Sequence, residues 1–123
     1  MSSVLADLGN LHIVTGTITV TTNVWTLTSN DGSASLNDLG AGNVSVTFGQ
    51  AFLSAPAVVV ATLKATHEAA VTKDVVVESV STTTVEFVNH SIDDSGAGAT
   101  DLTTVDPDNG DGWMFIAIGL RNN

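Results

Sequence analysis

The most constraining feature of this sequence is residues 113–120, a predicted strand that is apolar on both faces. Successive side chains of a strand point to opposite sides of the sheet, so Trp113, Phe115 and Ala117 are expected to share one face. The opposite face then carries Met114, Ile116, Ile118 and Leu120. Helices cover both faces of a parallel sheet, but this sequence has almost no helix-compatible segment. We therefore expect a second sheet on one side of the strand and another copy of the chain on the other.

The composition and the spacing of the apolar segments predict an all-β domain. Valine and threonine occur 17 times each, and β-branched residues favour strands. Strand-like segments recur about every ten residues, which is typical of sandwiches. The sequence therefore predicts an antiparallel, jelly-roll-like β-sandwich of about seven to eight strands. It spans residues 11–123 as a single domain after a short N-terminal arm, residues 1–10. The one helix-compatible piece, residues 64–72, is interpreted as a loop.

Several strands and turns are predicted from their local pattern. Residues 43–48 alternate regularly, with Val44, Val46 and Phe48 facing inward. Residues 75–81 and 83–91 are expected to pair as a hairpin. The sequence Asn30-Asp31-Gly32 has hairpin-turn chemistry, because Asn, Asp and Gly tolerate positive φ.

The charge balance disfavours several classes of partner. The net charge is −10, and lysine and arginine together number only three. Binding to nucleic acid or to an anionic membrane surface requires clustered cations, so neither is expected. The chain has no cysteine, no basic leader and no apolar run near the roughly 20 residues that span a bilayer. We therefore expect a protein made in a cytosol.

An acidic segment near the C-terminal end is the first candidate site. Asp106, Asp108 and Asp111 lie within six residues together with Asn109, and calcium prefers such oxygen ligands. The spacing does not match an EF-hand, because Gly110 occupies a ligand position and no bidentate glutamate follows. Asp, Asn and Gly also form ordinary turns. The segment is thus a cation site, a contact for a basic partner, or a solvated loop.

No catalytic constellation is visible. His12, His67 and His90 are far apart and have no partner at a metal-ligand spacing. Glu78 and Glu86 are placed to face each other across a hairpin, an arrangement that would suit glycoside chemistry, although strand carboxylates more often serve as solubilising charge. We expect no enzymatic activity, no cofactor and no metal.

Three patterns carry a resemblance to a known class. They are Val-Ser-Val-Thr-Phe at 44–48, Phe-Leu-Ser-Ala-Pro at 52–56 before a valine-rich strand, and a closing strand with Ile-Ala-Ile-Gly at 116–119. Residues 24–121 resemble small β-sandwich domains of bacteriophage virion proteins, found in fibre tips and capsid decoration proteins, and H-type lectin-like sandwiches. No sugar-contacting motif of the lectins can be matched.

The resemblance implies a trimeric or hexameric virion component without enzymatic activity. We expect a decoration, or cement, protein that binds the major capsid protein as a trimer on the capsid surface and is made in the host cytoplasm. The short stretch before the first strand favours this over a fibre protein with a shaft. The alternative is a receptor-binding or carbohydrate-binding tail-fibre tip. A third possible function is that of a calcium-dependent hydrolase that uses Asp106 and Asp108.

Overall fold

A computed structural model describes residues 10–21, 24–40, 42–56, 58–64, 71–93, 103–104 and 111–122. Nine strands and no helix are found in this part of the chain, and none of its segments has the form of a membrane-crossing helix. The strands are β1 (Leu11–Thr21), β2 (Val24–Ser29), β3 (Ser35–Gly40), β4 (Asn43–Thr47), β5 (Val58–Lys64), β6 (Val71–Val80), β7 (Thr84–Asp93), β8 (Thr103–Thr104) and β9 (Gly112–Leu120).

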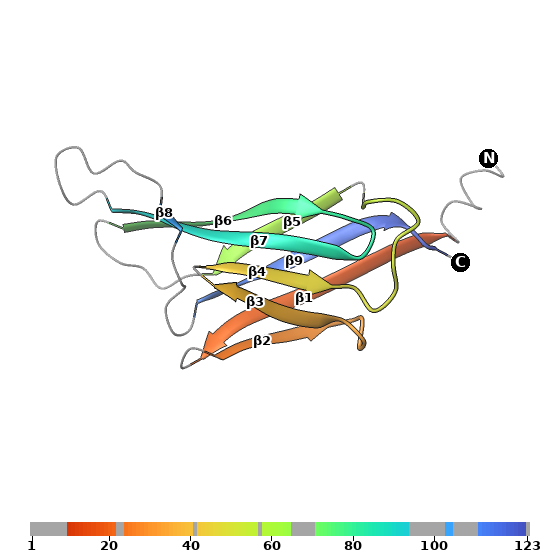
Figure 1. The fold of residues 1–123 in the computed structure, drawn as a ribbon, viewed down its shortest axis with the longest axis horizontal. Helices are drawn as coiled ribbons and strands as arrows, with labels where there is room; N and C mark the ends of the chain where they lie inside the picture. Colours follow the sequence, from red (N-terminus) through yellow and green to blue (C-terminus); the bar gives the residue numbers. More distant parts are fainter. Residues whose placement is uncertain are drawn as a thin grey trace.

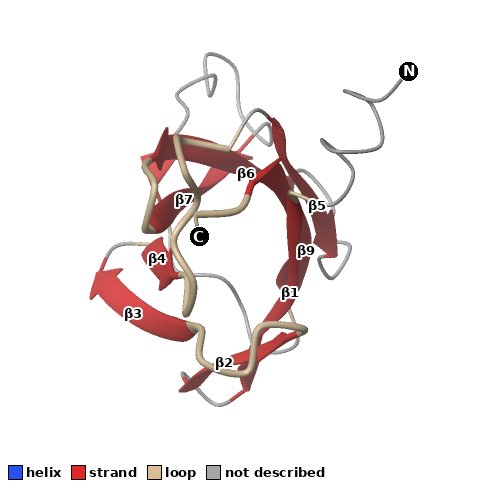
Figure 2. Ribbon diagram, turned by 90° about the vertical axis from the view of Figure 1, so that its right-hand side faces the viewer, coloured by secondary structure: helices blue, strands red, loops and turns tan. Residues whose placement is uncertain are grey.

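The strands form two antiparallel sheets packed face to face (Figures 1 and 2). The first sheet has the order β2-β1-β9-β5, and the second has the order β3-β4-β7-β6, with the two-residue β8 also paired to β7. The chain changes sheets after β2, β4, β5 and β8, whereas the β1–β2, β3–β4 and β6–β7 hairpins each stay within one sheet. The predicted antiparallel β-sandwich is therefore confirmed.

Strand alternation builds the core between the sheets. Val44 and Val46 of β4 are fully buried, as are Val14 and Ile18 of β1, and Phe48 is nearly so. Their neighbours Ser45 and Thr47 lie on the outer side, as the sequence predicts. Among the described side chains, the inward sides of the main strands are thus mostly apolar, with His12 and Asn89 as buried polar residues.

The centre of the core is a group of aromatic rings from both sheets. The Trp113 ring lies 5.6 Å from that of Trp25 and 5.5 Å from that of Phe87, both edge to face. Phe87 also lies 5.2 Å from Phe115. The Phe115 ring lies beneath Gly16, where any Cβ would overlap with it. A glycine at position 16 therefore allows a large ring between two adjacent strands.

The segment from Phe48 to Pro56 closes one end of the sandwich (Figure 2). The Phe52 amide donates to the Thr82 carbonyl at 2.8 Å, and the Leu53 amide donates to the Leu120 carbonyl at 2.9 Å. These bonds join the β6–β7 turn of the second sheet to the end of β9 in the first. The buried Phe52 ring packs 4.6 Å from the ring of His12. The segment with the Phe-x-x-x-Pro pattern thus covers this end of the core.

The predicted hairpin at residues 30–32 is wrong, because β2 and β3 belong to different sheets. The Asn30 side chain accepts a hydrogen bond from the Thr15 amide at 2.8 Å and donates to the Ile13 carbonyl at 2.9 Å, in place of a further residue of β2. The Asp31 carboxylate accepts from the Gly49 amide at 2.7 Å. These side chains end β2 and turn the chain into the second sheet.

Candidate interaction surface

The outward side of β9 is apolar and exposed to solvent. Trp113, Phe115 and Ala117 point into the core and are at most 1% exposed. In contrast, Met114 is 55% exposed and Ile116 is 45% exposed. The predicted alternation of this strand is therefore confirmed, and the four residues expected at an oligomer interface lie on the outside of a single chain, Ile118 partly buried.

Strand β5 widens this apolar surface. Val60 lies directly beside Ile116, and Val58 lies beside Ile118. Val60 is 54% exposed, so the burial of this pair by the fold itself is incomplete. On the other side of β9, the exposed Ile13 of β1 is paired with Ile118. We refer to six of these side chains as the aliphatic strip: Val58, Val60, Met114, Ile116, Ile118 and Leu120.

Threonines cover the remainder of the same face. Thr15 and Thr17 of β1 lie beside Ile116 and Met114. On β2, Thr28 continues the row of Thr17, and Thr26 is paired with Thr19. None of the four strands contains an aspartate or a glutamate, and Lys64, at the end of β5, carries their only fixed charge. The outer face of the first sheet is therefore half aliphatic, half hydroxyl-bearing and almost free of charge.

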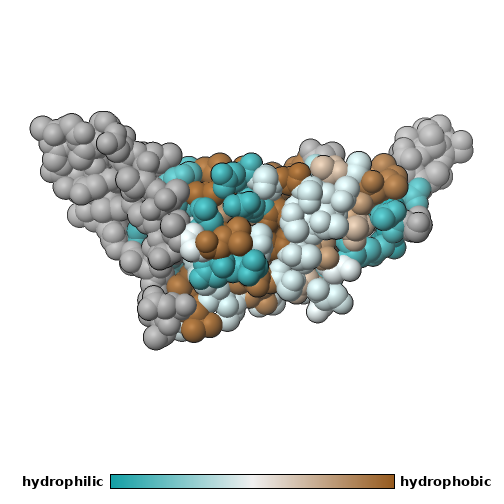
Figure 3. All heavy atoms as spheres, in the orientation of Figure 1, coloured by the Kyte–Doolittle hydropathy of each residue, from teal (hydrophilic) through white to brown (hydrophobic). Residues whose placement is uncertain are grey.

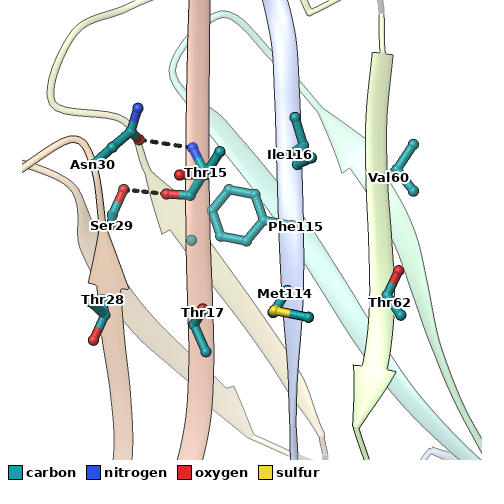
Figure 4. Close-up of a pocket in the computed structure, with 11 residues that line it drawn as sticks. Thr15, Thr17, Thr28, Ser29, Asn30, Val60, Thr62, Met114, Phe115 and Ile116 are labelled. Carbon is teal, nitrogen blue, oxygen red and sulfur yellow. Dashed lines mark hydrogen bonds between the residues drawn. The ribbon is translucent and has the colours of Figure 1, made fainter.

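A shallow depression of about 550 Å³ lies in the middle of this face (Figure 4). Thr28, Thr17, Met114 and Thr62 form one row across it, and Thr15, Ile116 and Val60 form the next. Its lining is mainly apolar and contains no carboxylate. Such a hollow can accept a protruding aliphatic side chain, whereas it offers no group for acid–base chemistry.

The acidic segment is only partly described. Asp106 and Asp108 lie outside the described residues. The Asp111 side chain is 1% exposed, and its Oδ2 lies 3.0 Å from Nζ of Lys73. Lys73 belongs to β6 of the second sheet, and Asp111 directly precedes β9 of the first. Contrary to the expectation of a surface contact, the Asp111 carboxylate is buried because it joins the two sheets.

The other titratable candidates are not brought together. His12 is buried in the first sheet, where its Nε2 lies 3.2 Å from the Gln50 carbonyl oxygen, and His90 lies opposite Asp74 in the second. His67 is outside the described residues. A bulge between Val77 and Ser79 places Ser79 opposite Glu86, so Glu78 does not face it as predicted.

Within the described ranges, no group of three or more acidic, histidine or cysteine side chains is arranged to hold a metal ion. The exposed aliphatic strip therefore remains the best-defined candidate for function. Comparison of the chain with protein-family models, curated proteins and solved structures yields no match.

Proposed function

We propose that this chain is a non-enzymatic structural protein of a bacteriophage virion, a capsid decoration protein that binds the major capsid protein as a homo-oligomer. The observation that carries the proposal is the aliphatic strip, which is exposed on a sheet that contains no carboxylate. Contiguous apolar surface of this kind marks sites of protein association in soluble proteins. The low charge of the chain, 13% of residues, also suits a protein that is packed among neighbours.

A decoration protein would stabilise the shell by adding contact area where capsid subunits meet. Each buried square ångström of apolar surface contributes roughly 25 cal/mol, so many modest contacts across a shell raise its resistance to heat and internal pressure. The sandwich suits this role, because its core is closed and its outer faces are free for contact. Its location would be the capsid surface of the virion.

The proposal is tested by mixing purified protein with capsids that lack decoration. We expect co-sedimentation with the particles, an additional density on them in cryo-electron microscopy, and a higher temperature of DNA release. Particles that neither bind the protein nor gain heat resistance would refute the proposed role.

The alternative is a carbohydrate-binding tip domain of a tail fibre, for which the depression on the first sheet would be the binding site. The lining of the depression offers hydroxyl and amide groups to a sugar but no carboxylate. The rings of Trp113, Phe115 and Phe87 lie inside the core, where they cannot stack on a ligand. Specific binding on a glycan array, combined with no capsid binding, would favour this alternative.

A further inference from the structure

We infer that the aliphatic strip is covered by the same strip of a second copy, with a two-fold axis lying between the two faces. This inference rests on the proposed homo-oligomeric function and adds to it the surface and the symmetry of the contact. Three observations carry it: the distribution of charge, the area of the face and the presence of one strip on each copy.

The distribution of charge favours a second copy on the first sheet over a basic partner. A chain with a net charge of −10 is repelled by its own copies wherever carboxylates meet. On the second sheet, Asp74 and Glu78 are exposed and Glu86 is partly exposed, and Figure 3, which views that side, shows hydrophilic groups among apolar ones. On the first sheet, no strand contains a carboxylate. This is therefore the face on which two copies can meet without like-charge repulsion. A basic partner would instead be attracted to the carboxylates on the outer face of the second sheet.

The size of the face is sufficient for a stable contact. The whole outer face, with four strands spaced about 4.8 Å apart and a length of nine residues in β9, has a flat projection of about 600 Å². The accessible area exceeds this projection because the side chains protrude. It therefore approaches the roughly 800 Å² that each partner contributes to a standard protein interface.

The single strip favours a two-fold axis. The first sheet curves around the core, so that its outer side is convex (Figure 2), and two convex surfaces meet first along one band at the centre of their contact. The aliphatic side chains are concentrated in one such band on β9 and β5, whereas threonines predominate on the outer side of β1 and β2, where Ile13 and Val24 are exposed as well. A contact that uses the same patch on both copies is isologous and closes as a dimer, whereas a ring of three needs two different patches on each copy. One strip per copy therefore favours two-fold pairing.

The pairing also gives the depression a role. Three residues of the strip, Val60, Met114 and Ile116, line the depression. In a face-to-face pair, outward side chains of the two strips would fill the two depressions. The flexible methionine side chain adapts to such irregular hollows.

The first test is the mass of the purified chain in solution, measured by light scattering across a concentration series. We expect the mass of two chains of 12.6 kDa. Val60→Asp should yield single chains, because it places two carboxylates in one dry contact. Val24→Asp is the matched control: Val24 is 59% exposed, compared with 54% for Val60, but it lies on β2 at the opposite edge of the same sheet. This variant should remain paired.

The second test addresses the two-fold symmetry. Ile116→Asp and Ile116→Lys should each be single chains, and an equimolar mixture of the two should restore a two-chain species, because residue 116 meets its own copy. The side chain of Ile116 points outward, so both variants should keep the circular dichroism spectrum and melting behaviour of a folded sandwich.

The outcomes separate this inference from the proposed function. A mass of three chains that is lost in Val60→Asp would overturn the two-fold pairing but leave an oligomeric decoration protein. A dimer that survives both Val60→Asp and Ile116→Asp would show that the aliphatic strip is not the interface. A single chain at all concentrations would overturn the inference and the homo-oligomeric part of the proposed function. A dimer with the expected variants that fails to bind capsids would overturn only the capsid role.

Discussion

The two sheets of this sandwich have the same chemistry on their inner faces and different chemistry on their outer faces. Phe87 of the second sheet and Phe115 of the first are equally buried and lie against each other. Outward, Glu86 beside Phe87 is a carboxylate, whereas Ile116 beside Phe115 is aliphatic and 45% exposed. The inner faces are constrained by folding, which requires apolar side chains there. The outer faces are not, so their difference indicates what each sheet meets outside the chain.

The largest expected effect comes from the shared core, where the difference between the sheets should vanish. Phe115→Ala and Phe87→Ala each remove a fully buried ring, and we expect each to lower the free energy of unfolding by about 3–5 kcal/mol. Urea unfolding monitored by circular dichroism measures both. A loss below about 1 kcal/mol for either variant would show that the ring does not belong to the core.

A similar effect is expected at the charged link between the sheets. Asp111→Ala leaves Lys73 without the carboxylate that lies 3.0 Å from its Nζ, and removing one partner of a buried pair costs about 3–5 kcal/mol. The double variant Lys73→Met/Asp111→Leu should recover part of the loss, because it leaves no unpaired buried charge. Additivity of the two single losses in the double variant would contradict a coupling between these residues.

A smaller effect is expected where β2 leaves the first sheet. Asn30→Ala removes one hydrogen bond from the Thr15 amide and one to the Ile13 carbonyl. At about 0.5–1.5 kcal/mol per bond, and with partial replacement by water, we expect a total loss near 1 kcal/mol. Amide hydrogen exchange should become faster at Thr15, while the amides of β6 and β7 should be unaffected; a uniform change would indicate that Asn30 stabilises the whole domain instead.

The smallest effect on stability, and the sharpest comparison of the outer faces, is expected from conservative changes there. Ile116→Thr and Glu86→Gln should each change the free energy of unfolding by no more than about 0.5–1 kcal/mol, since both side chains lie on the surface. Ile116→Thr should nevertheless weaken self-association measured by analytical ultracentrifugation, and Glu86→Gln should not. Equal effects of both variants on self-association would show that the copies do not associate through the outer face of the first sheet.

Salt provides the corresponding test without a substitution. Raising the ionic strength from about 0.1 M to about 1 M shortens the Debye length from about 10 Å to about 3 Å and screens exposed charges. Because the aliphatic strip contains no charge, self-association should not weaken as salt increases. A dimer that dissociates at high salt would instead depend on ion pairs.

Local periodicity accounts for the parts of the fold that the sequence predicted correctly. The alternation of β4 and β9 depends on the two-residue period of a strand, which needs no knowledge of neighbouring strands. The same reasoning failed for Asn30-Asp31-Gly32, because residues that suit a hairpin also suit a turn between sheets. The turn between sheets is instead associated with the hydrogen bond from the Gly49 amide to the Asp31 carboxylate, a contact between positions 18 residues apart.

The sequence by itself determined the β class, the inward side of the main strands and the presence of an apolar outer side on β9. Only the tertiary structure decided that β5 lies beside β9, so that Val60 and Ile116 form one strip, and that Asp111 is buried against Lys73. The physical reason is that periodicity acts between neighbouring residues, whereas strand order and the pairing of buried charges depend on contacts between distant segments that form only when the core closes.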